Sequence, residues 1–386
     1  MTELELEAYS RKKTTESEPD IFRKLQVHLD KMPVGYPPTE SGVEIRILKR
    51  LFTPEEAEIA TRMQFQPLTV EQIHERLKNP GITVEELEII LDRMVTKGSI
   101  LYFTQKIEGK EVKFYGNAFW ALGMYEFQVN KLTKDFCEDI EQYHEEAFWE
   151  EFNMTKLPQL RTIPISQTLT INDSIAPYDD VRKIIMERTS AIAVGPCICK
   201  QEKDIMGESC KQTDIRETCF FFGAAAKLYV DKSQGRMITK EEALKKLKEA
   251  EEAGLVLQPT NSKRPIGFCC CCGCCCAILS NQKILTTHPI EFFSTSYYAI
   301  VDSERCVGCG TCLDRCQMEA IEIIDDVATI RADRCIGCAL CVSTCPNEAK
   351  ILKKKDEEYE PPADTVEYFK QLTEIKASLV SKSKKV

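Results

Sequence analysis

The sequence is poor in histidine and tryptophan, with 4 His and 2 Trp among 386 residues. It has no HExxH zinc motif, no GxSxG nucleophile elbow and no GxxxxGK[ST] phosphate loop. No GxGxxG follows a predicted strand, so we expect no nicotinamide or flavin site of the Rossmann type. These absences leave little for acid–base hydrolysis or for nucleotide-driven chemistry.

Long apolar runs are also missing. No uninterrupted apolar stretch approaches the roughly 18 residues that a membrane span needs. The first residues, Met-Thr-Glu-Leu-Glu-Leu-Glu, lack a basic segment followed by an apolar one, so we expect no secretory signal. The formal net charge is −10. This balance argues against nucleic acid as a partner and favours a partner protein with a basic patch.

Cysteine, by contrast, is abundant, with 20 residues. In a chain without an export signal, this number indicates metal ligands in a reducing, cytoplasmic compartment rather than disulfides. The length allows two or three domains, each with its own core.

The C-terminal part contains one cysteine motif twice. Cys306-Val-Gly-Cys309-Gly-Thr-Cys312-Leu-Asp-Arg-Cys316 is followed by Cys335-Ile-Gly-Cys338-Ala-Leu-Cys341-Val-Ser-Thr-Cys345-Pro346. Over about residues 296–352 the chain resembles the bacterial-type ferredoxins that bind two [4Fe–4S] clusters. The resemblance implies one-electron transfer. Zinc is disfavoured, because zinc sites prefer CxxC pairs that are separated by a longer loop.

The same resemblance implies that the fourth cysteine of each run reaches the other cluster. One cluster would then be bound by Cys306, Cys309, Cys312 and Cys345, and the second by Cys335, Cys338, Cys341 and Cys316. Gln317 stands where this family usually has a proline, and it restores a backbone N–H beside Cys316. We expect strands at 298–301 and 349–352 and a hairpin at 321–330.

A second group of cysteines lies in the middle of the chain. It consists of Cys197, Cys199, Cys210, Cys219 and the run 269–276, which Gly273 interrupts. We expect at least one further iron–sulfur cluster, bound by Cys197, Cys199 and cysteines of the run, with Cys210 or Cys219 completing it. The candidates within the run are Cys269, Cys271, Cys272, Cys274 and Cys275. Because neighbouring side chains diverge, adjacent cysteines are expected to bind different irons or none, with Gly273 as the hinge.

Two other interpretations of the central cysteines stay open. One is a zinc site of Cys197, Cys199, Cys210 and Cys219, and the other is a dithiol or persulfide redox centre. The triplet Cys271-Cys272-Gly273 resembles the cysteine-rich modules of heterodisulfide reductases, which implies an unusual cubane-like cluster. Since oxygen attacks such clusters, we expect an anaerobic setting.

The N-terminal third predicts three helices that begin near Thr53, Leu68 and Thr83, followed by a hairpin up to Tyr115. This order resembles winged helix-turn-helix domains over about residues 43–115. The third helix is rich in carboxylates, which would repel a phosphate backbone, so we expect a docking module rather than a DNA reader. Residues 135–152 predict an acidic amphipathic helix with His144 on its surface.

The sequence therefore predicts an α+β multidomain protein with five parts. They are an extended arm with a short helix (1–42), a winged-helix-like domain plus the acidic helix (43–160), a cysteine-rich iron–sulfur domain (161–295), a two-cluster ferredoxin domain (296–355) and a helical, basic tail (356–386). We expect an electron carrier or a subunit of an oxidoreductase complex, which docks its redox partner through the N-terminal domain. The alternatives are a catalytic reductase subunit acting at the mid-chain cysteines and a redox-sensing transcription regulator.

Overall fold

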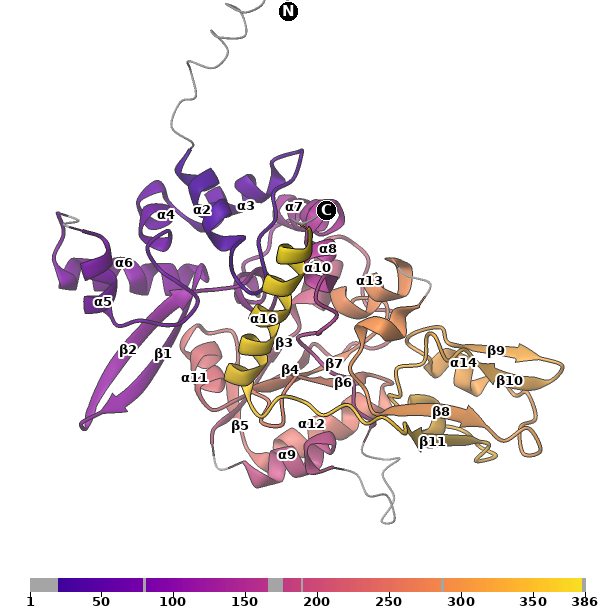
Figure 1. Ribbon diagram of the computed structural model, residues 1–386. Coiled ribbons are helices and arrows are strands. Elements are labelled where there is room, and N and C mark those ends of the chain that lie inside the picture. Colours follow the sequence, from indigo (N-terminus) through magenta and orange to yellow (C-terminus); the bar gives the residue numbers. More distant parts are fainter. Residues whose placement is uncertain (1–19, 79–80, 166–175, 189, 286–287, 384–386) are drawn as a thin grey trace, which may run out of the picture.

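The computed structural model describes residues 20–78, 81–165, 176–188, 190–285 and 288–383. Its N-terminal part is built from helices (Figure 1). These are α2 (Ile21–Leu29), α3 (Val43–Leu51), α4 (Pro54–Ala60), α5 (Val70–Arg76) and α6 (Val84–Lys97). Thr53, Thr69 and Thr83 each cap the helix that follows, and each forms a capping box with the residue three positions later. Residues 1–19 of the predicted arm lie outside the described residues.

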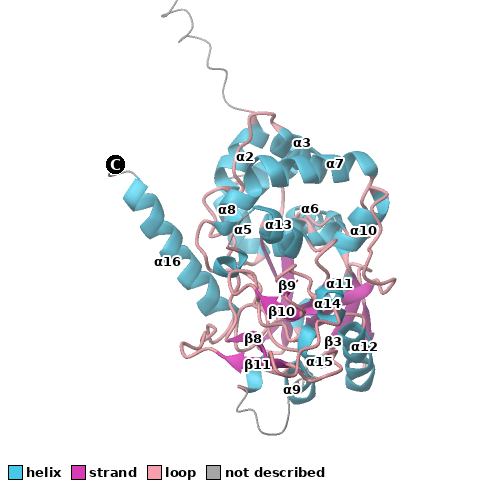
Figure 2. Ribbon diagram, turned by 90° about the vertical axis from the view of Figure 1, so that its right-hand side faces the viewer, coloured by secondary structure: helices cyan, strands magenta, loops and turns pink. Residues whose placement is uncertain are grey.

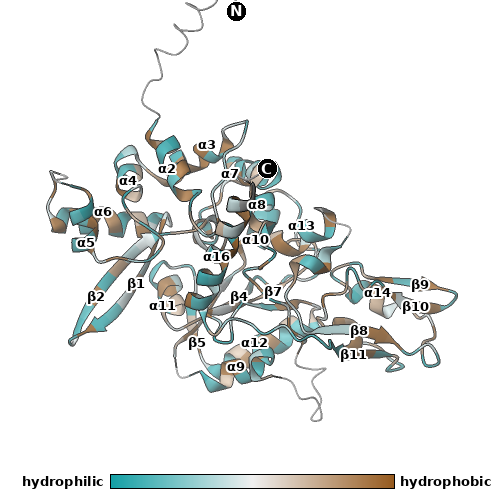
Figure 3. Cartoon of the chain, in the orientation of Figure 1, coloured by the Kyte–Doolittle hydropathy of each residue, from teal (hydrophilic) through white to brown (hydrophobic). Residues whose placement is uncertain are grey.

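An antiparallel hairpin follows α6, with strands β1 (Ile100–Ile107) and β2 (Lys110–Asn117). Its far end carries Lys106, Glu108 and Lys110 and is hydrophilic (Figure 3). Three helices and a hairpin thus stand where the sequence predicts them, and the winged-helix interpretation remains a prediction.

The acidic segment at 135–152 forms α7 (Lys134–Tyr143), a π-helical turn (His144–Phe148) and α8 (Trp149–Asn153). The expectation of a surface histidine here is wrong, because His144 is 7% exposed. Its ring lies among aromatic side chains, and the indole N–H of Trp120 donates to His144 Nε2 at 2.9 Å. Burial lowers the pKa of His144 to about 3, so the imidazole is neutral.

A five-stranded antiparallel sheet forms the centre of the molecule, with strand order β5-β3-β4-β7-β6. The strands are β3 (Ile192–Pro196), β4 (Glu217–Phe222), β5 (Arg236–Ile238), β6 (Val256–Pro259) and β7 (Gly267–Cys271). The helices around the sheet are α9 (Val181–Glu187), α10 (Ile198–Ile205), α11 (Ala224–Asp231), α12 (Lys240–Glu252) and α13 (Ala277–Leu285). Helices α9 and α12 share a core with the sheet, whereas α10 and α11 contribute Ile198 and Leu228 to the N-terminal core.

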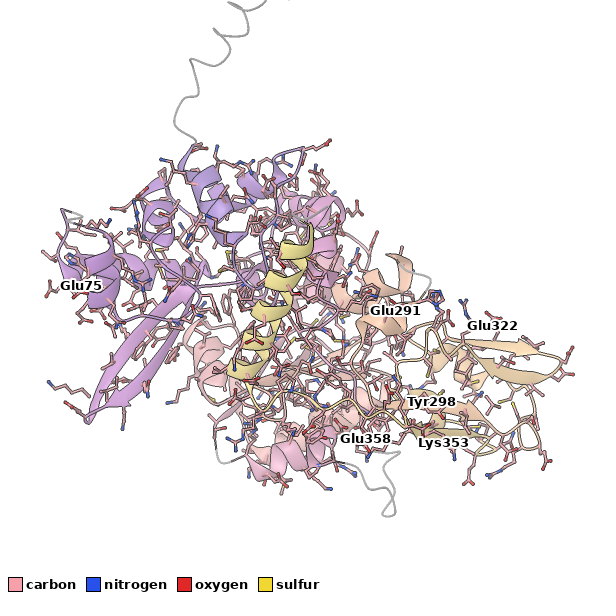
Figure 4. All side chains as sticks on the ribbon, viewed as in Figure 1. Glu75, Glu291, Tyr298, Glu322, Lys353 and Glu358 are labelled. Carbon is pink, nitrogen blue, oxygen red and sulfur yellow. The ribbon has the colours of Figure 1, made fainter. Side chains whose placement is uncertain are left out.

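The cysteine repeat forms two small sheets at one end of the molecule (Figures 1 and 2). Strand β8 (Tyr297–Val301) pairs with β11 (Lys350–Lys354), and β9 (Ile321–Ile324) pairs with β10 (Val327–Ile330). Two short helices, α14 (Thr311–Arg315) and α15 (Leu340–Ser343), follow the cysteine loops. Tyr298 stands opposite Lys353 in the first pair, as Figure 4 shows. Met318, Ile336 and Leu340 belong to the same apolar core as the central sheet.

Short helical turns connect the larger elements. They lie at Glu126–Gln128, Pro177–Asp179 and Pro289–Phe292. The segment Trp120–Met124 is irregular, because Ala121, Leu122 and Gly123 have non-helical backbone angles.

The last helix, α16 (Thr365–Ser383), returns from the cysteine repeat to the N-terminal helices (Figure 1). The Phe369 ring stacks on Phe119 at a centroid distance of 4.9 Å and lies 5.3 Å from the Phe65 ring. Within the described part of the chain, no helix combines the length and apolar character that a membrane span requires.

Candidate metal centres

Four cysteines line a cavity at the far end of the repeat, and we name them the outer set. They are Cys306, Cys309, Cys312 and Cys345. Cys309 is exposed and Cys312 is buried, so the outer set reaches from the surface into the interior. Backbone N–H groups point at two of the sulfurs: Ala328 donates to Cys306 Sγ at 3.4 Å and Ala349 to Cys345 Sγ at 3.2 Å. These amide hydrogen bonds stabilise a thiolate, and the one from Ala328 is the main cause of the lowered pKa of Cys306.

Lys350 lines the same cavity. It is 4% exposed, and its Nζ has no hydrogen-bond partner among the described residues. A buried ammonium without a partner is costly. The chemistry of a [4Fe–4S] cluster fits this position, because a cluster in its 2+ state with four thiolates carries a net negative charge.

A second cavity lies on the side of the central sheet, and its four cysteines form the inner set. They are Cys316, Cys335, Cys338 and Cys341. The Ala320 N–H donates to Cys316 Sγ at 3.2 Å, which repeats the relation of Ala349 to Cys345 in the outer set. Burial raises the pKa of Cys338 to about 12. Such a thiol ionises only where a cation stabilises the thiolate, as a metal does.

The outer and inner sets contain the cysteines that the sequence assigns to two clusters. In each cavity, three cysteines come from one run and the fourth comes from the other run. That each set binds a [4Fe–4S] cluster remains a prediction.

The mid-chain cysteines separate into two further groups. The first, which we name the cysteine tetrad, consists of Cys210, Cys272, Cys274 and Cys275. Its sulfurs all lie within 4.8 Å of one another. Cys210 Sγ is 3.6 Å from Cys272 Sγ and 3.7 Å from Cys274 Sγ, and Cys274 Sγ is 3.7 Å from Cys275 Sγ. The adjacent residues Cys274 and Cys275 therefore do not diverge as the sequence led us to expect.

The second group is a closed ring of thiol contacts, which we name the six-cysteine ring. Its members, in the order of contact, are Cys197, Cys219, Cys269, Cys271, Cys276 and Cys199. Cys219 on β4 stands directly opposite Cys269 on β7, and Cys271 points to the same face because side chains alternate along a strand. Cys197 immediately precedes α10, and Cys276 immediately precedes α13.

The ring is buried and contains thiols of very different acidity. The pKa of Cys276 is lowered well below its usual value, first by the Cys199 thiol and also by the backbone N–H of Leu279. Contacts with Cys219 and Cys271 lower the pKa of Cys269 to about 6. The thiols that donate in these contacts have raised pKa values, which is the pattern of a coupled network.

This arrangement divides the residues that the sequence singled out. Cys197, Cys199, Cys219, Cys269 and Cys271 meet in the ring, whereas Cys210 joins Cys272, Cys274 and Cys275. The four cysteines of the zinc alternative are therefore not brought together. Cys276 completes the ring, although the sequence did not single it out as a ligand. Cys270 belongs to neither group, because it points to the opposite face of β7. Among the described cysteines, none forms a disulfide.

The tetrad lies against the inner set. The Gly273 N–H donates to Gln317 Oε1 at 2.7 Å, and Gln317 Nε2 donates to Gln212 Oε1 at 2.9 Å. A Cβ atom on Gly273 would lie 2.2 Å from the Gln317 carbonyl oxygen, so glycine allows this approach. Gln317 follows Cys316 of the inner set directly, and Gly273 stands within the tetrad.

A family model for the 4Fe-4S dicluster domain matches residues 299–352. No curated protein and no solved structure matches the chain. The protein therefore contains a 4Fe-4S dicluster domain, joined to a cysteine-rich site in the middle of the chain.

Proposed function

We propose that this protein relays single electrons between redox partners. The outer and inner sets would each hold a [4Fe–4S] cluster, and the six-cysteine ring would hold a further iron–sulfur cluster. When bound, such a cluster accepts or releases one electron. The observation that carries the proposal is the hydrogen bond from Gly273 to Gln317, because it places the turn between Cys271 and Cys276, two members of the ring, against the inner set.

The exposed side of the outer set is the proposed place of exchange with a partner. Val307 is 64% exposed and Ile324 is 51% exposed, and exposed acidic side chains lie near them in the sequence. Asp325 and Asp326 form the turn between β9 and β10. Exposed apolar side chains with acidic neighbours suit a partner whose contact surface is basic, and the association would weaken as salt is added.

The N-terminal helices and hairpin are proposed to bind a protein partner rather than DNA. The basic side chains around the third helix are already engaged by carboxylates. Lys113 forms ion pairs with Glu88 and Asp92, at 3.0 and 2.7 Å. Arg93 and Lys97 both pair with Glu56. These pairs leave little positive charge for phosphates.

The proposal is tested by counting iron and acid-labile sulfide per chain after anaerobic purification. Two ferredoxin clusters account for about eight irons, and a ring cluster raises the number to about twelve or more. Cys219→Ser should remove the additional iron and sulfide while it leaves the ferredoxin clusters in place. Cys270→Ala is the matched control, because this cysteine is buried in the same strand outside the ring, and it should keep all the iron. A wild-type count of about eight irons would contradict the ring cluster.

A further inference from the structure

We propose that the cysteine tetrad binds a single metal ion in tetrahedral geometry, either zinc or iron. This site goes beyond the proposed relay and rests on different residues. The ion would be held by Cys210 from one loop and by Cys272, Cys274 and Cys275 from the turn between β7 and α13.

The sulfur–sulfur distances carry this inference. A metal–sulfur bond of about 2.3 Å places two ligands of a regular tetrahedron about 3.8 Å apart. Three sulfur–sulfur distances within the tetrad are 3.6, 3.7 and 3.7 Å. Cys272 also contacts Cys275, so four of the six edges of a tetrahedron are present as sulfur contacts.

A cubane cluster fits these sulfurs less well than a single ion does. Each thiolate of a cubane binds a different iron, so its four sulfurs stand farther apart than four ligands of one ion. Among the described residues, the tetrad is the one group of potential ligands whose atoms all lie within 4.8 Å of one another. The outer and inner sets instead surround cavities.

The loop that contains Cys210 has little structure of its own, and a metal ion would help to stabilise it. Residues 206–216 contain no helix or strand, and Gly207, Glu208, Ser209 and Lys211 are exposed. Cys210 packs against the central core, but a loop this polar buries little apolar surface, so an ion would add to the contacts that hold Cys210 against the 272–275 turn. Four thiolates around one ion with no open position form a structural site, which stabilises the arrangement of its ligands.

The position of the tetrad gives the ion a second consequence. Gly273, between Cys272 and Cys274, donates to Gln317 beside the inner set. Gln212, two residues after Cys210, accepts from the same Gln317 side chain. Both segments that meet Gln317 are therefore tied to the ion, which would hold the 4Fe-4S dicluster domain against the central sheet.

X-ray absorption on the anaerobically purified full chain tests the site without any substitution. A zinc edge with four sulfur neighbours at about 2.3 Å and no neighbouring metal would establish a mononuclear zinc site. If iron is the occupant, Mössbauer spectra should show a high-spin, tetrahedral component in addition to the clusters. A sample that shows neither of these signals would overturn the proposal.

Substitution then locates the ion. Cys210→Ser should remove about one zinc or iron per chain and leave the acid-labile sulfide unchanged, because a single ion contains no sulfide. Cys270→Ala and Cys219→Ser should both retain the ion, so that its loss is separated from loss of the proposed ring cluster. If Cys210→Ser instead removes sulfide and several irons together, the tetrad belongs to a cluster. If mass spectrometry of the native protein shows Cys210 in a disulfide, the site is a redox-active thiol pair. Either result overturns the single-ion assignment.

Discussion

The backbone N–H of Gly273 donates to the side-chain oxygen of Gln317 across 2.7 Å. Gln317 is 7% exposed, so this bond lies in the interior, where an unpaired donor is costly. The usual proline at this position would have no amide side chain to offer. Gln317, which departs from the ferredoxin pattern, therefore links the dicluster domain to the segment of the central cysteines.

Replacement of Gln317 by alanine should loosen this attachment. The change leaves the Gly273 N–H without its acceptor, which costs about 1–3 kcal/mol. We expect a lower thermal unfolding temperature and faster hydrogen exchange in residues 272–275. Gln105→Ala, in an exposed part of β1, is the control and should leave both unchanged. An unaltered exchange rate at Gly273 in Gln317→Ala would contradict the importance of this bond.

Lys350 should raise the reduction potential of the outer cluster. Its buried, unpaired ammonium lies at the cavity of the outer set and stabilises the additional negative charge of the reduced state. Lys350→Met should lower one of the two ferredoxin potentials, by an amount on the order of tens of millivolts. Lys353→Met, on the exposed side of the same strand, is the matched control. Redox titration followed by EPR measures the potentials in each variant. Equal potentials in Lys350→Met and Lys353→Met would argue against the role of Lys350.

The two clusters proposed for the dicluster domain should differ in their access to reagents. Cys309 of the outer set is exposed, whereas the inner set has no exposed member: Cys341 is buried and its three partners are partly buried. Under mild oxidation with a chelator, iron should therefore be lost in a fast phase and a slow phase. Cys309→Ser should remove the fast phase, and Cys338→Ser the slow one, while the mid-chain metal stays in place. A single phase in the wild-type protein would contradict this order.

The neutral His144 should make the protein less stable in acid. Its pKa is about 3 in the folded state and about 6.5 when unfolded. The unfolded chain therefore binds a proton first as the pH falls. Above about pH 6.5 the histidine is neutral in both states and does not alter the free energy of unfolding. Between about pH 6.5 and pH 3 the free energy of unfolding falls by about 1.4 kcal/mol per pH unit. His144→Gln, which keeps an acceptor for the Trp120 N–H, should show a smaller drop in unfolding temperature between pH 7 and pH 5. If the unfolding temperature drops equally in the wild-type protein and in His144→Gln, the histidine does not titrate in this way.

The elements that the sequence predicted well are those that depend on local signals. The capping threonines Thr53 and Thr83 mark helix starts through hydrogen bonds within one turn, and the structure has helices at both places. The strands beside the cysteine repeat are also found, with β8 at Tyr297–Val301 where 298–301 was predicted.

The arrangement of the central cysteines depends on distant contacts and could not be predicted in the same way. Cys219 meets Cys269 because β4 pairs with β7, and no local pattern specifies that pairing. The alternation of side chains along a strand would have separated Cys270 from its neighbours, had the run been interpreted as a strand. His144 was misjudged because its segment is acidic, whereas the aromatic residues that bury it come partly from Trp120 and Tyr125, outside that segment.

Helix α16 joins the last part of the chain to the first. Lys376 Nζ donates to the carbonyl oxygens of Asp30 and Met32, at 3.1 and 2.9 Å, and forms an ion pair with Glu151. During synthesis this helix emerges after all the cysteines of the chain. The aromatic side chains that pack against Phe369, which are those of Phe65 and Phe119, therefore remain uncovered after all the cysteines have been synthesised. If the cysteines bind metal as proposed, they can do so before α16 covers these aromatic side chains, and we expect the packing of α16 to be a late step in folding.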